Sequence, residues 1–168
     1  QINSKDFVIE KEFEDIHPKI VNMLINKLGS IGKKIHTGRS RNDQVLVATQ
    51  LYLKNEINEI KKYCINLLNT FIQMAEENKN NFLPGYTHLQ VTMPSSFGLW
   101  FSAYAESLID DMLYLKTAYK INDQNPLGSA AGYVSSFNLD RDFTTSELGF
   151  SELKYNVISS QMNRGKVE

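Results

Sequence analysis

The chain has 168 residues, 42% of them apolar, and its 18 lysines and arginines nearly balance its 19 aspartates and glutamates. That length and apolar content suffice for one folded domain and exclude intrinsic disorder. The formal net charge of −1 lacks the basic excess of a nucleic-acid-binding surface. No apolar run approaches the roughly 18 residues of a membrane-spanning helix, and no signal-peptide pattern opens the chain, so we expect a cytoplasmic protein with no membrane or nucleic-acid partner.

The two ends of the sequence indicate a piece of a longer protein. The first residue is Gln1 rather than methionine, and a helical pattern that begins at Asn156 is cut off at Glu168. We expect a single helical-bundle fragment, with a leading segment and short helix over residues 1–36. Residues 37–168 would form a central helical region that is truncated at its C-terminal end.

Helical spacing starts early in the chain. Residues 16–28 place apolar side chains on one face, Asp15 is a suitable N-cap, and Gly29 offers a C-terminal stop. The segment from Ser30 to Arg41 has the composition of a loop. It lacks the Gly-Lys-Ser/Thr ending of a phosphate-binding Walker loop.

Two much longer helices follow. Residues 42–78 contain no glycine or proline, and apolar residues from Ile57 to Met74 recur at alternating steps of three and four, as in a helical bundle. A third helix is predicted from about Pro94 to residue 121, and a shorter one from Asp140 to Gly149. No convincing pair of alternating strands appears. The predicted fold class is therefore all-α, a bundle of long antiparallel helices.

Two polar stretches are candidate sites. Residues 37–44, Thr-Gly-Arg-Ser-Arg-Asn-Asp-Gln, place two arginines at the start of a long helix, where guanidinium groups and the helix N-terminus can hold an anion. Asn42 and Asp43 are favoured N-cap residues there. The second stretch, Thr87-His88-Leu89-Gln90, follows a proline-glycine turn between the two long helices. Each stretch also has a purely structural interpretation. The first can be a well-capped basic helix start, and the histidine of the second can be a structural residue.

Other site classes fit poorly. His17, His36 and His88 share no ligand-like spacing, so no metal site is predicted. Cys64 occupies an apolar helical position and is expected to be a buried structural thiol. A serine nucleophile would need an elbow motif that the sequence lacks.

Taken together, the motifs resemble the argininosuccinate lyase family of the fumarase/aspartase superfamily. The resemblance lies in four stretches: Glu14–His17, Lys34–Val45, Pro84–Gln90 and Pro126–Ser129. The second is the most specific, because related lyases such as adenylosuccinate lyase share the Thr-His turn but not Gly-Arg-Ser-Arg-Asn-Asp-Gln. Residues 93–100 and 133–136 differ from the sequence that is commoner in the family, which suggests a subfamily.

The resemblance implies reversible cleavage of argininosuccinate to arginine and fumarate in arginine biosynthesis, with no cofactor. It implies substrate contacts by Ser40, Arg41 and Asn42, binding of a substrate carboxylate by Thr87, and proton transfer involving His88, either as the base or by orienting another group. It also implies a homotetramer whose active sites are each assembled from three subunits.

The family's serine-containing loop and N-terminal substrate-binding segment are not among these 168 residues. Two alternatives therefore stay open: a non-catalytic helical scaffold derived from the same family, and another fumarate-releasing enzyme such as adenylosuccinate lyase. The reading frame beyond Glu168 would discriminate the scaffold from the enzyme.

Overall fold

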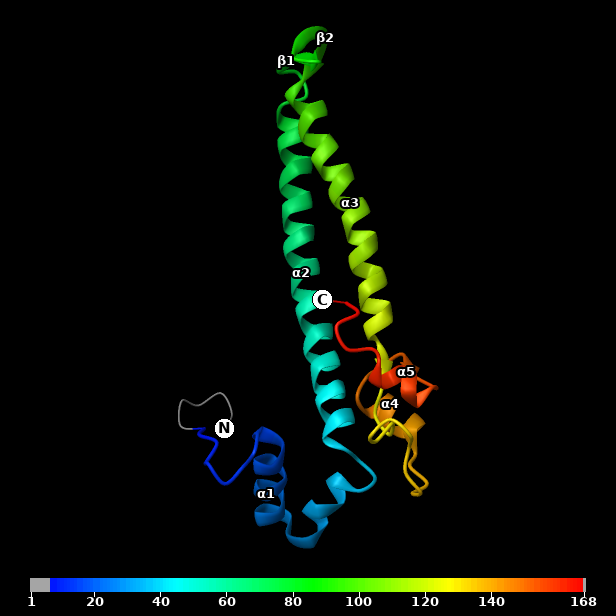
Figure 1. Ribbon diagram of the computed structural model, residues 1–168. Helices are drawn as coiled ribbons and strands as arrows, with labels where there is room; N and C mark the ends of the chain where they lie inside the picture. Colours follow the sequence, from blue (N-terminus) through cyan, green and yellow to red (C-terminus); the bar gives the residue numbers. More distant parts are fainter. Residues whose placement is uncertain (1–6, 168) are drawn as a thin grey trace. The chain divides into compact units, whose positions relative to one another are not determined.

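A computed structural model describes residues 7–167, which are mostly helical with a few short strands (Figure 1). The predicted all-α fold class is confirmed. Gln1 and Glu168, on which the expectation of a fragment rests, lie outside the described residues. The chain forms two compact units. The first unit comprises the residues up to Ala48 together with Gln124–Arg164, and the second unit comprises Thr49–Asp123 and the residues after Arg164.

The first unit opens with helix α1, Ile16–Leu28. Its N-cap is Asp15, whose Oδ1 accepts the N–H of His17 at 2.8 Å, and its C-cap is Gly29, as the sequence predicts. The following segment was expected to be a loop, and that expectation is wrong: Gly29–His36 is a 3₁₀ helix. Gly32 explains the difference, because its missing side chain lets this segment lie against the backbone of α1. A Cβ there would come within 2.7 Å of backbone atoms of α1.

The rest of the first unit is the segment Gln124–Arg164, near the end of the chain. Two short strands, β3 (Gln124–Asn125) and β4 (Glu152–Leu153), pair in parallel. Between them lies helix α4, Arg141–Glu147, whose N-cap Asp140 accepts the N–H of Phe143 at 2.8 Å, as predicted. Helix α5, Val157–Gln161, begins after Asn156 as predicted but ends after five residues. The expected continuation of this helix toward the chain end is therefore wrong.

The second unit is a pair of long helices. Helix α2, Arg41–Glu77, begins in the first unit and continues here, where it runs beside helix α3, Phe97–Asn122 (Figure 1). Asn122 donates its side-chain N–H to the Gln50 carbonyl at 2.7 Å, and the rings of Phe71 and Tyr104 stack with centroids 5.6 Å apart. The predicted helix over residues 42–78 is confirmed to within one residue at each end.

A β-hairpin connects these two helices. Strand β1, Phe82–Thr87, pairs antiparallel with β2, Gln90–Ser96, and the register shifts between Gly85 and Tyr86. The expectation that no strand pair exists is wrong here. Pro84 and Gly85 disfavour a central strand, but in a two-stranded ribbon both strands are edges, where proline is tolerated. Because β2 includes Pro94, α3 starts three residues later than predicted, with Ser96 as its N-cap.

Few apolar side chains of the second unit are fully buried. Ile57 and Ala105 are its buried apolar residues among those that the structure describes, and Cys64 is only half-buried rather than buried. Many large apolar side chains on α2 and α3 are exposed, among them Tyr52, Ile60, Tyr63, Leu67, Ile72, Leu99, Trp100, Ile109, Leu113 and Tyr114. Within residues 7–167, none of the helices combines the length and apolar character needed to cross a bilayer.

Candidate functional site

The turn that precedes α2 is shaped by its own side chains. Ser40 lies just before the helix, where its Oγ accepts the N–H of Asn42 at 3.3 Å. Asp43 reaches back, and its Oδ1 accepts the N–H of Ser40 at 2.9 Å. This pattern is a variant of the capping box in which the serine hydroxyl accepts the N–H of the second rather than the third helical residue. Ser40 therefore takes the N-cap position for which the sequence had suggested Asn42 or Asp43. The hydroxyl of Ser40, the guanidinium of Arg41 and the amide of Asn42 are consequently gathered at one helix N-terminus.

Arg41 is held by two carboxylates that precede α1. Its Nη1 lies 2.6 Å from Glu14 Oε1, its Nη2 donates to Glu14 Oε2 at 2.7 Å, and its Nε lies 3.1 Å from Asp15 Oδ2. The hydrogen bond with Glu14 raises the pKa of Arg41 and lowers the pKa of Glu14. All three nitrogens of this guanidinium therefore have a carboxylate partner within the chain, and the contact with Glu14 is the forked, two-point kind.

Arg41 and Asn42 line a pocket of about 690 Å³ in the first unit. Two histidines that the sequence analysis gave no catalytic role, His17 and His36, also line it. His36 Nδ1 accepts a hydrogen bond from the amide of Gln44 at 3.2 Å. The remaining lining residues are Phe13, Pro18, Val21, Asn22, Ile25 and Gln44. The pocket therefore joins an apolar wall to cationic, amide and imidazole groups, a combination suited to a small polar anion. The sequence signal for His36 was its place inside the stretch Lys34–Val45.

The other arginine of the turn, Arg39, lines a separate pocket. That cavity, of about 240 Å³, also includes Lys34, Thr37 and Arg141. Burial lowers the pKa of Arg141, whose Nε donates to the Leu127 carbonyl at 2.9 Å. Arg41 and Arg39 therefore line different pockets of the first unit.

Asp43 makes contacts in the structure that its sequence position does not predict. It is 0% exposed, and its Oδ2 accepts N–H groups of Gly128 at 3.3 Å and Ala130 at 3.0 Å. Both donors belong to the segment Leu127–Gly132, here called the small-residue loop. An aspartate three residues after Ser40 indicates a capping box, but contacts with residues 85 and 87 positions away have no local signature.

The small-residue loop is itself fixed by several side chains. Asn125 Oδ1 accepts the N–H of Leu127 at 3.0 Å, and the Gln161 amide donates to Ser129 Oγ at 2.8 Å. Gly128 has φ +89°, and a Cβ there would lie 2.9 Å from Arg141, so this position requires glycine. The small residues of the loop thus let its own neighbours, such as the Arg141 side chain, approach the backbone closely.

Thr87 and His88 lie at the tip of the hairpin in the second unit. Thr87 pairs with Gln90, so His88 and Leu89 form a two-residue connection, and both have positive φ, 50° and 64°. A hairpin connection with both central residues at positive φ is a type I′ turn, which normally takes Asn-Gly. Using histidine and leucine there costs about 1 kcal/mol or more each, and such strain concentrates at functional sites. His88 is exposed, and Leu89 is 98% exposed.

The predicted site residues therefore form two groups, one in each unit. Ser40, Arg41 and Asn42 are neighbours at the start of α2, and Thr87 and His88 are neighbours in the hairpin turn.

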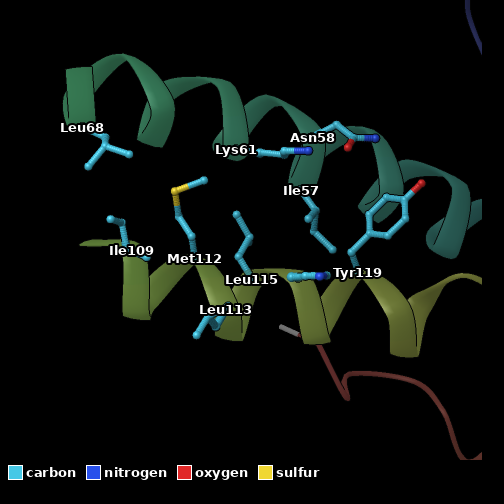
Figure 2. Close-up of a pocket in the computed structure, with 10 residues that line it drawn as sticks. Ile57, Asn58, Lys61, Leu68, Ile109, Met112, Leu113, Leu115 and Tyr119 are labelled. Carbon is cyan, nitrogen blue, oxygen red and sulfur yellow. The ribbon is translucent and has the colours of Figure 1, made fainter. Parts of the chain in front are cut away.

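A further cavity of about 560 Å³ lies between α2 and α3, in the second unit (Figure 2). Its lining is mainly apolar, with side chains of the two helices, such as Ile57 and Leu115, directed into the space between them. It includes none of the predicted site residues; the full lining is Ile57, Asn58, Lys61, Leu68, Ile109, Met112, Leu113, Leu115, Lys116 and Tyr119. Such a lining offers packing surface rather than proton-transfer chemistry.

Comparison with known proteins gives consistent matches. A protein-family model described as "Lyase" matches residues 1–165. An argininosuccinate lyase of Bacteroides fragilis is 56% identical over 163 residues, which is 97% of this chain and 36% of the relative. The argininosuccinate lyase of Xanthomonas campestris pv. campestris is 43% identical over 162 residues, 96% of this chain and 38% of the relative. The resemblance seen in the motifs is confirmed, although the chain spans little more than a third of these relatives.

Among solved structures, an EDDS lyase variant with bound fumarate superposes with a TM-score of 0.78 at 26% identity. The match covers 83% of this chain and 28% of that protein.

Proposed function

Because this chain belongs to the lyase family whose model matches residues 1–165, we propose that it is part of an argininosuccinate lyase. The complete protein, here called the parent protein, would reversibly eliminate arginine from argininosuccinate and release fumarate. The observation that carries this proposal is the 56% identity to an argininosuccinate lyase along 97% of the chain. A structural neighbour that binds fumarate supports the same product class.

The chemistry of such an elimination fits the residues present. A base removes a proton from the carbon next to a carboxylate, negative charge develops on that carboxylate, and an acid protonates the departing guanidinium. Arg41 would bind the anionic substrate by exchanging its forked contact with Glu14 for the same contact with a substrate carboxylate. Ser40 and Asn42 add neutral donors at the same helix N-terminus.

In the hairpin turn, Thr87 is proposed to bind a substrate carboxylate and His88 to take part in proton transfer. What supports a role for His88 is its exposure in a turn whose backbone conformation is costly for this residue type. Residues of the parent protein outside this chain would supply the remaining proton-transfer group.

We further propose that the parent protein is a cytoplasmic homotetramer in which each active site draws on three chains. The many exposed large apolar side chains along α2 and α3 support association, because burying them against another chain would remove them from water.

The test is an assay of the parent protein with argininosuccinate, in which fumarate is followed by its ultraviolet absorbance. We expect fumarate release with argininosuccinate and none with adenylosuccinate. Release from adenylosuccinate alone would assign the other lyase activity, and no release from either by a folded protein would favour the scaffold.

A further inference from the structure

We propose that Asp43 is a positioning residue that ties the Ser40–Asn42 turn to the small-residue loop and so fixes the groups that bind substrate. The inference rests on the proposed function of that turn. Asp43 itself is buried and would touch no substrate; it would act through the backbone of Ser40.

The contacts of Asp43 make it a bridge. One carboxylate oxygen accepts the N–H of Ser40 at 2.9 Å, and the other accepts those of Gly128 at 3.3 Å and Ala130 at 3.0 Å. At 0% exposure, an aspartate carboxylate is costly to bury unless such donors compensate it. Three backbone donors divided between two segments satisfy both oxygens and join the segments.

The far side of this bridge is well fixed. The small-residue loop is bound by Asn125 through the N–H of Leu127, by Arg141 through the Leu127 carbonyl, and by Gln161 through Ser129 and the Ala130 carbonyl. The loop therefore provides a rigid reference, and Asp43 carries that rigidity to the turn that presents Arg41. An ordinary capping box would fix the turn only to its own helix.

The bridge needs a carboxylate rather than any polar side chain of that size. An asparagine would present one accepting oxygen and one NH₂ group. The NH₂ group would then point at the backbone N–H of at least one of the two segments, and two donors cannot form a hydrogen bond. Asp43→Asn keeps the volume and removes the bridge, which makes it the informative substitution.

The experiment measures steady-state kinetics of Asp43→Asn in the parent protein with argininosuccinate. We expect KM to rise about 10-fold while kcat changes by less than about threefold, because a displaced binding turn weakens substrate binding. A merely structural role would lower the fraction of folded enzyme, and with it the apparent kcat, without changing KM. The matched control is Asp123→Asn, which removes a buried carboxylate that pairs with Lys54 in the second unit. This control should lower thermal stability and leave KM unchanged.

Hydrogen exchange on the same proteins measures the bridge without reference to activity. Peptides covering residues 38–44 and 126–132 should exchange faster in Asp43→Asn than in the unmodified protein. In Asp123→Asn the exchange rates of the same peptides should not change. Should Asp43→Asn fail to fold, Asp43→Glu keeps the carboxylate one methylene further out and is expected to raise KM by a smaller factor.

The outcomes separate the two proposals. An unchanged KM in folded Asp43→Asn or Asp43→Glu, or unchanged exchange in both peptides, overturns the positioning role and leaves the proposed function intact. Absence of fumarate release by the unmodified parent protein overturns the proposed function, and this inference with it.

Discussion

His88 sits in a left-handed backbone conformation, which restricts the substitutions that can test its chemistry. Asparagine adopts positive φ more readily than most residues, so His88→Asn removes the imidazole without adding backbone strain. We expect turnover of the parent protein to fall about 10²–10⁴-fold, the usual contribution of a positioned proton-transfer group, with little change in melting temperature.

Leu89→Asn is the matched control for this substitution, because Leu89 shares the turn and the positive φ. Its turnover should stay within a few-fold of the unmodified protein. Near-normal turnover of His88→Asn together with a large loss of melting temperature would return His88 to a structural role.

Glu14 provides a pH-dependent test of the pairing at the binding turn. Its pKa in the folded chain is lowered from 4.5 by the hydrogen bond with Arg41. Since the folded value is the lower one, this pair stabilises the fold above about pH 4.5, and the contribution is lost as pH falls through the lowered pKa. We expect Glu14→Gln to reduce the urea midpoint at pH 7 and to have a smaller effect at about pH 3.

Glu12→Gln, which removes an exposed carboxyl two residues away, is the control for this experiment. Urea titrations of the two variants and the unmodified chain at both pH values give the comparison. An equal effect of Glu14→Gln at both pH values would exclude the charge pairing as the cause.

At this scale the sequence predicts local roles better than distant ones. The caps Asp15 and Asp140 follow from residue type and spacing, because a cap bonds within three residues. At the start of α2 the prediction of Asn42 or Asp43 was wrong, because Ser40 is the cap. The bridge made by Asp43 could not be predicted, because it joins groups more than 80 positions apart. The type I′ turn at His88 and Leu89 could not be predicted either, since such turns normally take Asn-Gly rather than His-Leu.

Among the elements, the start of α3 packs tightly against the C-terminal end of α2 and the residues after it, at Gly98. A Cβ at this position would lie 2.6 Å from Lys79 Cα and 2.7 Å from the Ala75 carbonyl oxygen, both backbone atoms that cannot easily move. We expect Gly98→Ala to destabilise the chain by roughly 1–2 kcal/mol, since overpacking outweighs the better helix propensity of alanine.

The comparison for Gly98→Ala is Ser102→Ala, an exposed position one turn further along α3, which should change stability by less than about 0.5 kcal/mol. Circular dichroism during urea unfolding measures both. Equal stability of the two variants would mean that the helices can separate at Gly98 without cost.

Helices were predicted well as elements because their signal is a repeated pattern over many residues, as in α2. The hairpin of β1 and β2 was missed because its strands are irregular and contain Pro84, Gly85 and Pro94. The 3₁₀ helix after α1 was missed because Gly32 was interpreted as a loop residue, whereas it serves packing against α1.

For the whole molecule, the exposed apolar sides of α2 and α3 lead us to expect that the 168-residue chain self-associates. We also expect it to be catalytically silent, because the groups of a catalytic unit act together and part of the proposed unit lies outside this chain. Light scattering and a fumarate assay on the purified chain measure the two properties. A monodisperse monomer would contradict the first expectation, and measurable turnover would contradict the second.

The first unit is discontinuous in sequence, and this has a consequence for the order of folding during synthesis. The residues up to Ala48 cannot complete their unit until Gln124–Arg164 have left the ribosome, whereas the second unit is built mainly from one continuous stretch. Asn122, which bonds to Gln50, closes that stretch and holds its two ends together. Once this has happened, the first unit no longer bears the full loop-closure entropy of about 75 intervening residues. The nascent chain should therefore fold from its middle outward.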